Sequence, residues 1–282
     1  MLQLEGKRIQ LVFCDMDGTF LTSDKQVTQE NIRTVQKLAS EDVLFVPCTG
    51  RMRSGIPAEL ADMNEVRYLV CSMGATIYQR RGADFTVVLS GSIDTATVQA
   101  LYANLAPYEV QFDIFCSGRS YAEKARLEKI REYPINPGMM GFILEQRVPI
   151  DEDVPTFLCD GKKVERLNVY YKNPADRLAI QETLKSFPEL GYTFHDGCGI
   201  EIINKNYTKG SALRWICRHE GVPTEETLAI GDGENDIAMF AEAGIACAME
   251  NADPACKNAA QIVTEFSNDE DGVARLVESY LS

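Results

Sequence analysis

Short apolar runs near the start of the chain predict strands that are buried on both faces. Three such runs lie at 9–14, 43–46 and 68–71. Between the first two runs, apolar residues recur at helical spacing over 28–39, and Thr28 is the predicted N-cap. Strands and helices therefore alternate, which predicts a doubly wound, mostly parallel α/β sheet.

The pattern of apolar and polar residues is different in the middle of the chain. Polar and apolar residues alternate, as in strands of a sheet with one face in water, over 110–115, 166–170 and 199–203. Helices that would cover the other face of that sheet are predicted at 94–106, 123–131 and 174–187. Pro134, Pro137 and Gly138 interrupt the pattern near its middle. This mixture predicts an α+β domain.

The first pattern resumes near Lys209, which opens a predicted helix that ends at about Glu220. Further short strands are predicted at 227–230, 245–248 and 261–264, with helices beginning at 237 and 270. We therefore expect a core domain formed by 1–83 and 207–282, with residues 84–206 inserted as a separate domain.

Composition limits the classes of partner. The net charge of −14 argues against nucleic acid or an anionic membrane surface, but allows a small phosphorylated metabolite if a cation screens it. The nine cysteines form no CxxC pair, and no apolar run approaches a membrane span or a signal-peptide core. We expect a cytoplasmic protein with free thiols. The sequence leaves monomer and homodimer open.

Two carboxylates follow the first buried strand at once, since Asp15 and Asp17 are separated by a single residue. Ligands bind at the carboxyl edge of such sheets, and close carboxylates repel one another unless a cation offsets their charge. Mg²⁺ takes oxygen ligands and is often shared with a substrate phosphate. The site is therefore interpreted as a magnesium site, and the alternative is an ordinary acidic turn.

The metal hypothesis predicts further acids and a cation elsewhere in the chain. Asp232 and Asp236 follow the strand at 227–230, and Lys209 opens the helix before it. Asn235 can donate to an anionic oxygen. Taken alone, Asp236 is equally explained as a helix N-terminal acid, and Lys209 as a solvated surface lysine.

Thr49 and Gly50 follow the second strand. A hydroxyl and free backbone N–H groups in such a turn are suited to hold a phosphate.

Four motifs occur in the order that is typical of one family: Asp15–Thr19, Thr49–Arg51, Lys209–Gly210 and Gly231–Asp236. With these motifs the chain resembles phosphatases of the haloacid dehalogenase (HAD) superfamily, of the Cof type with a class IIB cap. The resemblance frames the whole chain. It implies a HAD-like Rossmannoid core and an inserted α+β cap that closes over the sheet edge and shapes specificity.

The resemblance also implies roles for the residues in these motifs. Asp15 would be the nucleophile that forms an aspartyl phosphate, and Asp17 would be the general acid and base. Mg²⁺ would be held by Asp15, the backbone carbonyl of Asp17 and Asp232, with support from Asp236. The phosphate oxygens would be held by Thr49, Gly50, Lys209 and Asn235.

The expected activity is Mg²⁺-dependent hydrolysis of a small phosphomonoester, such as a sugar phosphate, by a phosphoric monoester hydrolase. A phosphomutase or phosphotransferase of the same superfamily would use the same Asp15 and Asp17. A non-catalytic sensor of a phosphorylated metabolite is the alternative from another class, and it would not need Asp17 as an acid. Met73 stands where the family often has Asn, which leaves its contacts to substrate open.

Overall fold

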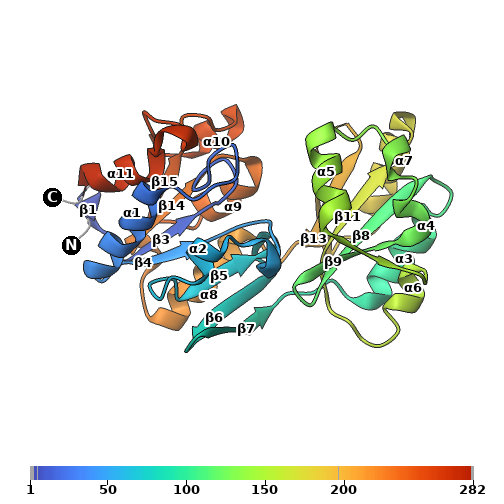
Figure 1. Cartoon of the computed structure of the whole chain (residues 1–282), viewed down its shortest axis with the longest axis horizontal. Helices are drawn as coiled ribbons and strands as arrows, with labels where there is room; N and C mark the ends of the chain where they lie inside the picture. The colour runs from blue at the N-terminus through green and yellow to red at the C-terminus, as the bar shows by residue number, and fades with distance from the viewer. Residues whose placement is uncertain (1–2, 5, 196, 281–282) are drawn as a thin grey trace. The chain divides into compact units, whose positions relative to one another are not determined.

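The computed structural model describes residues 3–4, 6–195 and 197–280. It separates into two compact units, the first formed by Met1–Ser90 with Tyr207–Ser282 and the second by Gly91–Asn206. Figure 1 shows the elements of both units.

A parallel sheet of five strands forms the centre of the first unit, in the order β16-β15-β14-β3-β4. Its strands are β3 (Leu11–Cys14), β4 (Leu44–Pro47), β14 (Thr227–Gly231), β15 (Ile245–Ala248) and β16 (Ile262–Val263). All four residues of β3 are buried, and the strand pairs with β14 on one side and β4 on the other. The apolar runs at 9–14, 43–46, 227–230, 245–248 and 261–264 therefore contribute strands to a parallel sheet, as predicted. The run at 68–71 is also a strand, but it pairs antiparallel in a separate sheet.

A three-stranded antiparallel sheet continues this sheet beyond β4. It consists of β5 (Tyr68–Cys71), β6 (Thr76–Arg81) and β7 (Asp84–Ser90). The Thr49 N–H donates to Val70 O over 2.8 Å, and this bond links the end of β4 to β5. The first unit includes the seven residues of β7 because β7 pairs with β6. The division at Ser90 thus differs from the expected boundary between 83 and 84.

Helices of the first unit pack in two sets, as right-handed crossovers of a doubly wound sheet require. They are α1 (Gln29–Ser40), α2 (Ala58–Ala61), α8 (Lys209–Glu220), α9 (Ile237–Phe240), α10 (Pro254–Ala259) and α11 (Gly272–Tyr280). Helix α1 packs against α11, and α8 packs against α9. Thr28 is the N-cap of α1 as predicted, and its side chain accepts from the Asn31 N–H.

Short elements complete the first unit. They are the hairpin of β1 (Gln3–Leu4) and β2 (Lys7–Arg8) and the 3₁₀ helices η1 (Arg53–Gly55), η2 (Ser72–Gly74), η5 (Thr224–Glu226), η6 (Glu234–Asp236) and η7 (Asn268–Glu270). Among the described helices, none is long and apolar enough to cross a membrane.

A six-stranded sheet forms the second unit, in the order β10-β9-β8-β11-β13-β12, and only the β9–β10 pair is parallel. The strands are β8 (Val110–Cys116), β9 (Arg119–Glu123), β10 (Arg147–Ile150), β11 (Val164–Tyr171), β12 (Leu190–His195) and β13 (Gly199–Asn204). The helices are α3 (Thr95–Leu105), α4 (Lys124–Leu127), η3 (Ile130–Glu132), α5 (Pro137–Gln146), α6 (Val154–Phe157), η4 (Pro174–Asp176) and α7 (Arg177–Lys185). Pro137 begins α5 after the N-cap Asn136, because the first helical position needs no N–H.

The prediction that this sheet has one face in water is wrong for its two central strands. Every residue of β8 and β11 is buried. Charged side chains of these strands pair with residues of other strands, as in the ion pair of Asp113 of β8 with Arg147 of β10, whose atoms lie 2.6 Å apart. Mutual pairing allows charged groups to be buried, which alternation alone does not show.

Candidate active site

Asp15 directly follows β3 and lies in a tight loop that turns at Gly18. Gly18 has φ of +81°, and a Cβ added there would come within 2.3 Å of Asp232 Oδ2. Only glycine fits both the backbone angle and the space. The motif thus needs Gly18 for close approach to a carboxylate from another strand.

Parallel pairing brings Asp232 beside Asp15. Strand β14 pairs with β3 so that Ile230 lies opposite Cys14, and both carboxylates follow at the same edge. The Thr19 hydroxyl donates to Asp232 Oδ1 over 2.7 Å and fixes that side chain.

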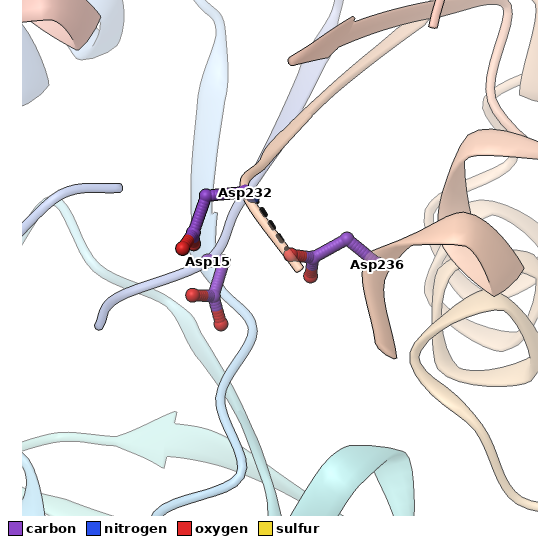
Figure 2. Close-up of side chains that lie close together, drawn as sticks. All are labelled: Asp15, Asp232 and Asp236. Atoms are coloured by element: carbon purple, nitrogen blue, oxygen red, sulfur yellow. Dashed lines mark hydrogen bonds between the residues drawn. The ribbon is translucent and has the colours of Figure 1, made fainter. Parts of the chain in front are cut away.

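Asp236 completes a group of three carboxylates. One oxygen from each of Asp15, Asp232 and Asp236 lies within 4.8 Å of the others. Figure 2 shows the three side chains close together. Asp236 Oδ2 accepts from the backbone N–H groups of Asp232, over 3.0 Å, and Gly233, over 3.1 Å. Asp236 therefore shapes the loop that carries Asp232.

Lys209 provides a cation against this group. It is the first residue of α8, after the N-cap Thr208, and is only 1% exposed. Its Nζ donates to Asp236 Oδ1 over 2.6 Å and to Asp15 Oδ1. The surface-lysine explanation is therefore wrong for Lys209.

A close backbone contact fixes the start of α8. Gly74 has φ of +102°, and a Cβ there would come within 2.3 Å of the Thr208 carbonyl and 2.7 Å of the Lys209 nitrogen. The end of η2 therefore packs directly on the turn that positions Lys209.

Electrostatics at this edge favour a bound cation. Three carboxylates against one ammonium leave two negative charges in excess when all are ionised. Burial raises the pKa of Asp15 well above its ordinary value and that of Asp232 to about 6. Burial would lower the pKa of Lys209, but Asp15 and Asp236 raise it far above the usual range. The oxygen donors and the uncompensated charge fit a divalent metal such as Mg²⁺.

Asp17 lies outside this group and is held by cations. Arg51 donates to both of its oxygens, from Nε to Oδ2 and from Nη2 to Oδ1, each over 2.7 Å, and Lys25 Nζ lies 3.0 Å from Oδ1. Burial would raise the pKa of Asp17, but Arg51 and Lys25 together lower it. A metal contact through the Asp17 backbone carbonyl stays a prediction.

The Thr49 loop already uses two of its backbone donors. The Thr49 N–H donates to Val70 O, and the Arg51 N–H donates to Thr49 Oγ1 over 3.0 Å. Since Oγ1 accepts there, its own proton is available to an anion, as the predicted phosphate role for Thr49 and Gly50 requires.

Asn235 contacts Met73 across the site. It is exposed in η6, and its amide donates to Met73 Sδ over 3.5 Å. Met73 has φ of +60°, in the left-handed region that Asn adopts more readily. Met73 Sδ thus accepts one of the two N–H donors of the Asn235 amide, and the second N–H is the one that can be offered to phosphate.

Sequence reasoning gave no role to three residues that organise the site. Thr19 and Arg51 belong to the motifs Asp15–Thr19 and Thr49–Arg51. Thr19 contacts Asp232 and Arg51 contacts Asp17, and the two residues of each pair are far apart in the sequence. Gly74 follows Met73 in the chain. Its positive φ and its close packing on Thr208 explain why glycine is needed there, and the sequence alone does not show either feature. Burial also raises the pKa of Cys14 and Cys48, so these thiols beside the site are poor nucleophiles.

Comparison with known proteins gives a consistent result. A family model for haloacid dehalogenase-like hydrolases matches residues 12–277. The phosphatase YwpJ of Bacillus subtilis (strain 168) is 25% identical over 299 residues, which cover 97% of this chain and 100% of YwpJ. The 5-amino-6-(5-phospho-D-ribitylamino)uracil phosphatase YwtE of the same strain is 24% identical over 288 residues, covering 97% and 99%.

Solved structures share the fold. A haloacid dehalogenase-like hydrolase from B. subtilis has a TM-score of 0.81 at 21% identity, covering 97% of this chain and 100% of the other. The subclass IIB sugar phosphatase BT4131 has a TM-score of 0.78 at 23% identity, covering 96% and 98%. The predicted fold class, an α/β core with an inserted cap domain, is confirmed.

Proposed function

Because this chain belongs to the haloacid dehalogenase-like hydrolase family and is a phosphatase of that family, we propose that it hydrolyses a small phosphomonoester with Mg²⁺ as cofactor. The reaction passes through an aspartyl phosphate on Asp15. The observation that carries this proposal is the buried group of Asp15, Asp232 and Asp236 with Lys209 at the carboxyl edge of the sheet.

Two half-reactions balance with these residues. An oxygen of Asp15 forms a bond to phosphorus, the ester P–O bond breaks, and the departing oxygen takes a proton from Asp17. A water molecule then gives a proton to Asp17 and attacks phosphorus. Inorganic phosphate leaves, and the Asp15 carboxylate is restored.

Charge neutralisation is the main demand of phosphoryl transfer, and buried groups supply it most effectively. Lys209 already contacts Asp15, so its ammonium lies beside the oxygen where negative charge gathers. Thr49 and Gly50 are the other proposed phosphate ligands. Asn235 can join them with the second N–H of its amide, since one N–H donates to Met73 Sδ.

The proposed ligands of Mg²⁺ are Asp15, Asp232 and the backbone carbonyl of Asp17, and Asp236 holds the Asp232 loop through two N–H bonds. When bound, the ion would neutralise the excess negative charge and orient the phosphoryl group. The raised pKa of Asp232, about 6, supports a site that is built for a cation.

The proposed substrate is a small phosphorylated metabolite, with sugar-like phosphates favoured. Two similar proteins support this class by name, since one is a ribitylaminouracil phosphate phosphatase and one a sugar phosphatase. A panel of sugar phosphates, nucleotides and cofactor phosphates, assayed with and without Mg²⁺, would define the substrate. Release of free phosphate from a hexose phosphate, rather than an isomer, separates a phosphatase from a phosphomutase.

A substitution of the nucleophile tests the mechanism. Asp15→Asn should lower the rate of p-nitrophenyl phosphate hydrolysis by about 10⁴-fold or more, with the fold intact by circular dichroism. Asp62→Asn, at an exposed carboxylate after α2, is the matched control and should keep full activity. Undiminished turnover by Asp15→Asn, or in excess EDTA, would refute the mechanism.

A cytoplasmic location and a monomeric or homodimeric state are further proposals. All nine cysteines are free, and all except Cys159 are buried, which supports a reducing compartment. Gel filtration with light scattering would decide between the two assembly states.

A further inference from the structure

Arg51 belongs to a quoted motif but has no part in the reaction as described so far. Its guanidinium forms a planar, two-point pair with Asp17, with both N···O distances at 2.7 Å. The third guanidinium nitrogen, Nη1, donates to the Gly55 carbonyl over 2.8 Å. Such a fork fixes direction as well as distance, unlike a single ammonium contact.

Among the described residues, only Arg51 and Lys25 hold the carboxylate of Asp17 in place. The carboxylate is 38% exposed, and its described partners are Arg51 and Lys25. Lys25 is itself 54% exposed, whereas Arg51 is 18% exposed and anchored at Gly55. Arg51 is therefore the fixed partner, and Lys25 is the looser one.

The pairing also distinguishes the two oxygens of Asp17. Oδ1 accepts from Arg51 Nη2 and from Lys25, which occupies both of its lone pairs. Among the described residues, only Arg51 donates to Oδ2, through Nε, so one lone pair is left for a proton. The geometry selects Oδ2 as the oxygen that exchanges a proton with the leaving group.

We propose that Arg51 is the positioning residue for Asp17, and that it directs Oδ2 toward the oxygen of the departing alcohol. This inference rests on the proposed phosphatase reaction. Arg51 does not touch the reacting atoms, so its effect should follow the need of each substrate for a proton.

Two esters of similar size test this dependence. Benzyl phosphate leaves as an alkoxide and needs a proton, whereas p-nitrophenyl phosphate leaves as a stable phenolate. The kcat/KM value reports steps up to the first irreversible bond cleavage, so it isolates protonation of the leaving group from later hydrolysis. Arg51→Ala should lower kcat/KM for benzyl phosphate about 100-fold and for p-nitrophenyl phosphate less than about 5-fold.

Matched variants make the test specific. Asp17→Asn should give the same difference between the esters, and adding Arg51→Ala to it should cause no further loss for benzyl phosphate. Arg51→Lys keeps the charge but not the fork, and should recover only part of the benzyl phosphate activity. Arg53→Ala removes a nearby guanidinium that lies over the Phe85 ring at 5.0 Å, and should change neither value.

Several results would overturn the inference. An equal loss for both esters would make Arg51 a phosphate-binding or structural residue. A further loss in the double variant would show that Arg51 acts independently of Asp17. If the wild-type chain hydrolyses neither ester, the proposed function fails and the inference with it. The inference about Arg51 fails and the proposed function stands if the wild type is active, Asp15→Asn is inactive, and Arg51→Ala lowers kcat/KM equally for both esters.

Discussion

Both units of the molecule bury charged side chains at a sheet, but they balance the charge differently. At the core sheet edge, Lys209 is the cation among the described residues that contacts the group of Asp15, Asp232 and Asp236. In the second unit, buried charges are found in ion pairs, such as Asp113 with Arg147 and Arg166 with Glu201.

The difference separates a site from a structural network. Burial would lower the pKa of Arg147, but Asp113 and Tyr170 raise it, so the charge of this arginine is compensated by its neighbours. At the core edge, burial raises the pKa of Asp15 and Asp232. Lys209 lowers both values, but not enough to offset burial. Uncompensated buried charge is costly unless a ligand relieves it, which is why it marks function.

Among the changes that test this contrast between the units, the largest effect is expected from removing the cation of the core edge. Lys209→Met should lower kcat for p-nitrophenyl phosphate by about 10²–10³-fold, because a buried charge beside the phosphoryl group is lost. Lys37→Met, at an exposed position of α1, is the control. A near-normal kcat for Lys209→Met would show that Lys209 has a structural role and does not contribute to catalysis.

Breaking a complete pair should instead damage stability. Asp113→Asn leaves Arg147 buried without its counter-charge and should lower the free energy of unfolding by about 3–5 kcal/mol. Asp151→Asn, whose contact with Lys124 is 3.6 Å long and exposed, should cost less than about 1 kcal/mol. Urea unfolding measures both, and equal small losses would contradict the contrast between the units.

The same Asp→Asn change at the core edge should have the opposite sign. A carboxyl whose pKa rises from 3.8 to about 6 costs the folded state about 3 kcal/mol above pH 6. Asp232→Asn removes that cost, so in EDTA at pH 7.5 the variant should be more stable than the wild type. It should also lose activity. A variant that is less stable than the wild type in EDTA would argue that Asp232 is compensated.

A dependence on pH and metal follows from the same group. The folded-state pKa of Asp232 is raised, so its contribution to the stability of the metal-free protein is most favourable below about pH 4 and is lost as pH rises to about 6. Mg²⁺ requires the ionised carboxylate. Mg²⁺ at about 100 times its dissociation constant at pH 7.5 should therefore stabilise by about 2–3 kcal/mol, and the same concentration should do much less at pH 5.

Thermal melts at the two pH values, with and without Mg²⁺, measure this effect. Asp232→Asn is the control and should show a much smaller response to the metal. A Mg²⁺ shift that is as large at pH 5 as at pH 7.5 would place the ion elsewhere.

The smallest expected effect concerns backbone strain at the core edge. Met73 has φ of +60°, which costs an ordinary L-residue about 1–2 kcal/mol and Asn less. Met73→Asn should raise the free energy of unfolding by up to about 1 kcal/mol, whereas Met73→Leu should gain nothing. Urea unfolding of both variants checks this, and equal stability would show that the left-handed conformation carries little strain here.

Local pattern determined much of the fold. The strand at 68–71 and the helix from Lys209 to Glu220 were predicted at the bounds that the structure has, because apolar runs and helical spacing act over neighbouring residues. The helix beginning at Ile237 has only four residues, since the chain must turn again before β15. The length of this helix is set by tertiary packing, and the spacing of apolar residues in the sequence does not predict it.

The sequence by itself determined which residue types follow each strand. It predicted that Asp15, Asp232 and Asp236 would meet, because parallel strands share their carboxyl ends, and the pairing of β14 with β3 that brings Asp15 and Asp232 together belongs to the tertiary structure. Only the tertiary structure decided the burial of Lys209, the fork of Arg51 on Asp17 and the packing of Gly74 on Thr208. These depend on distances between segments far apart in the chain, and no local pattern encodes such distances.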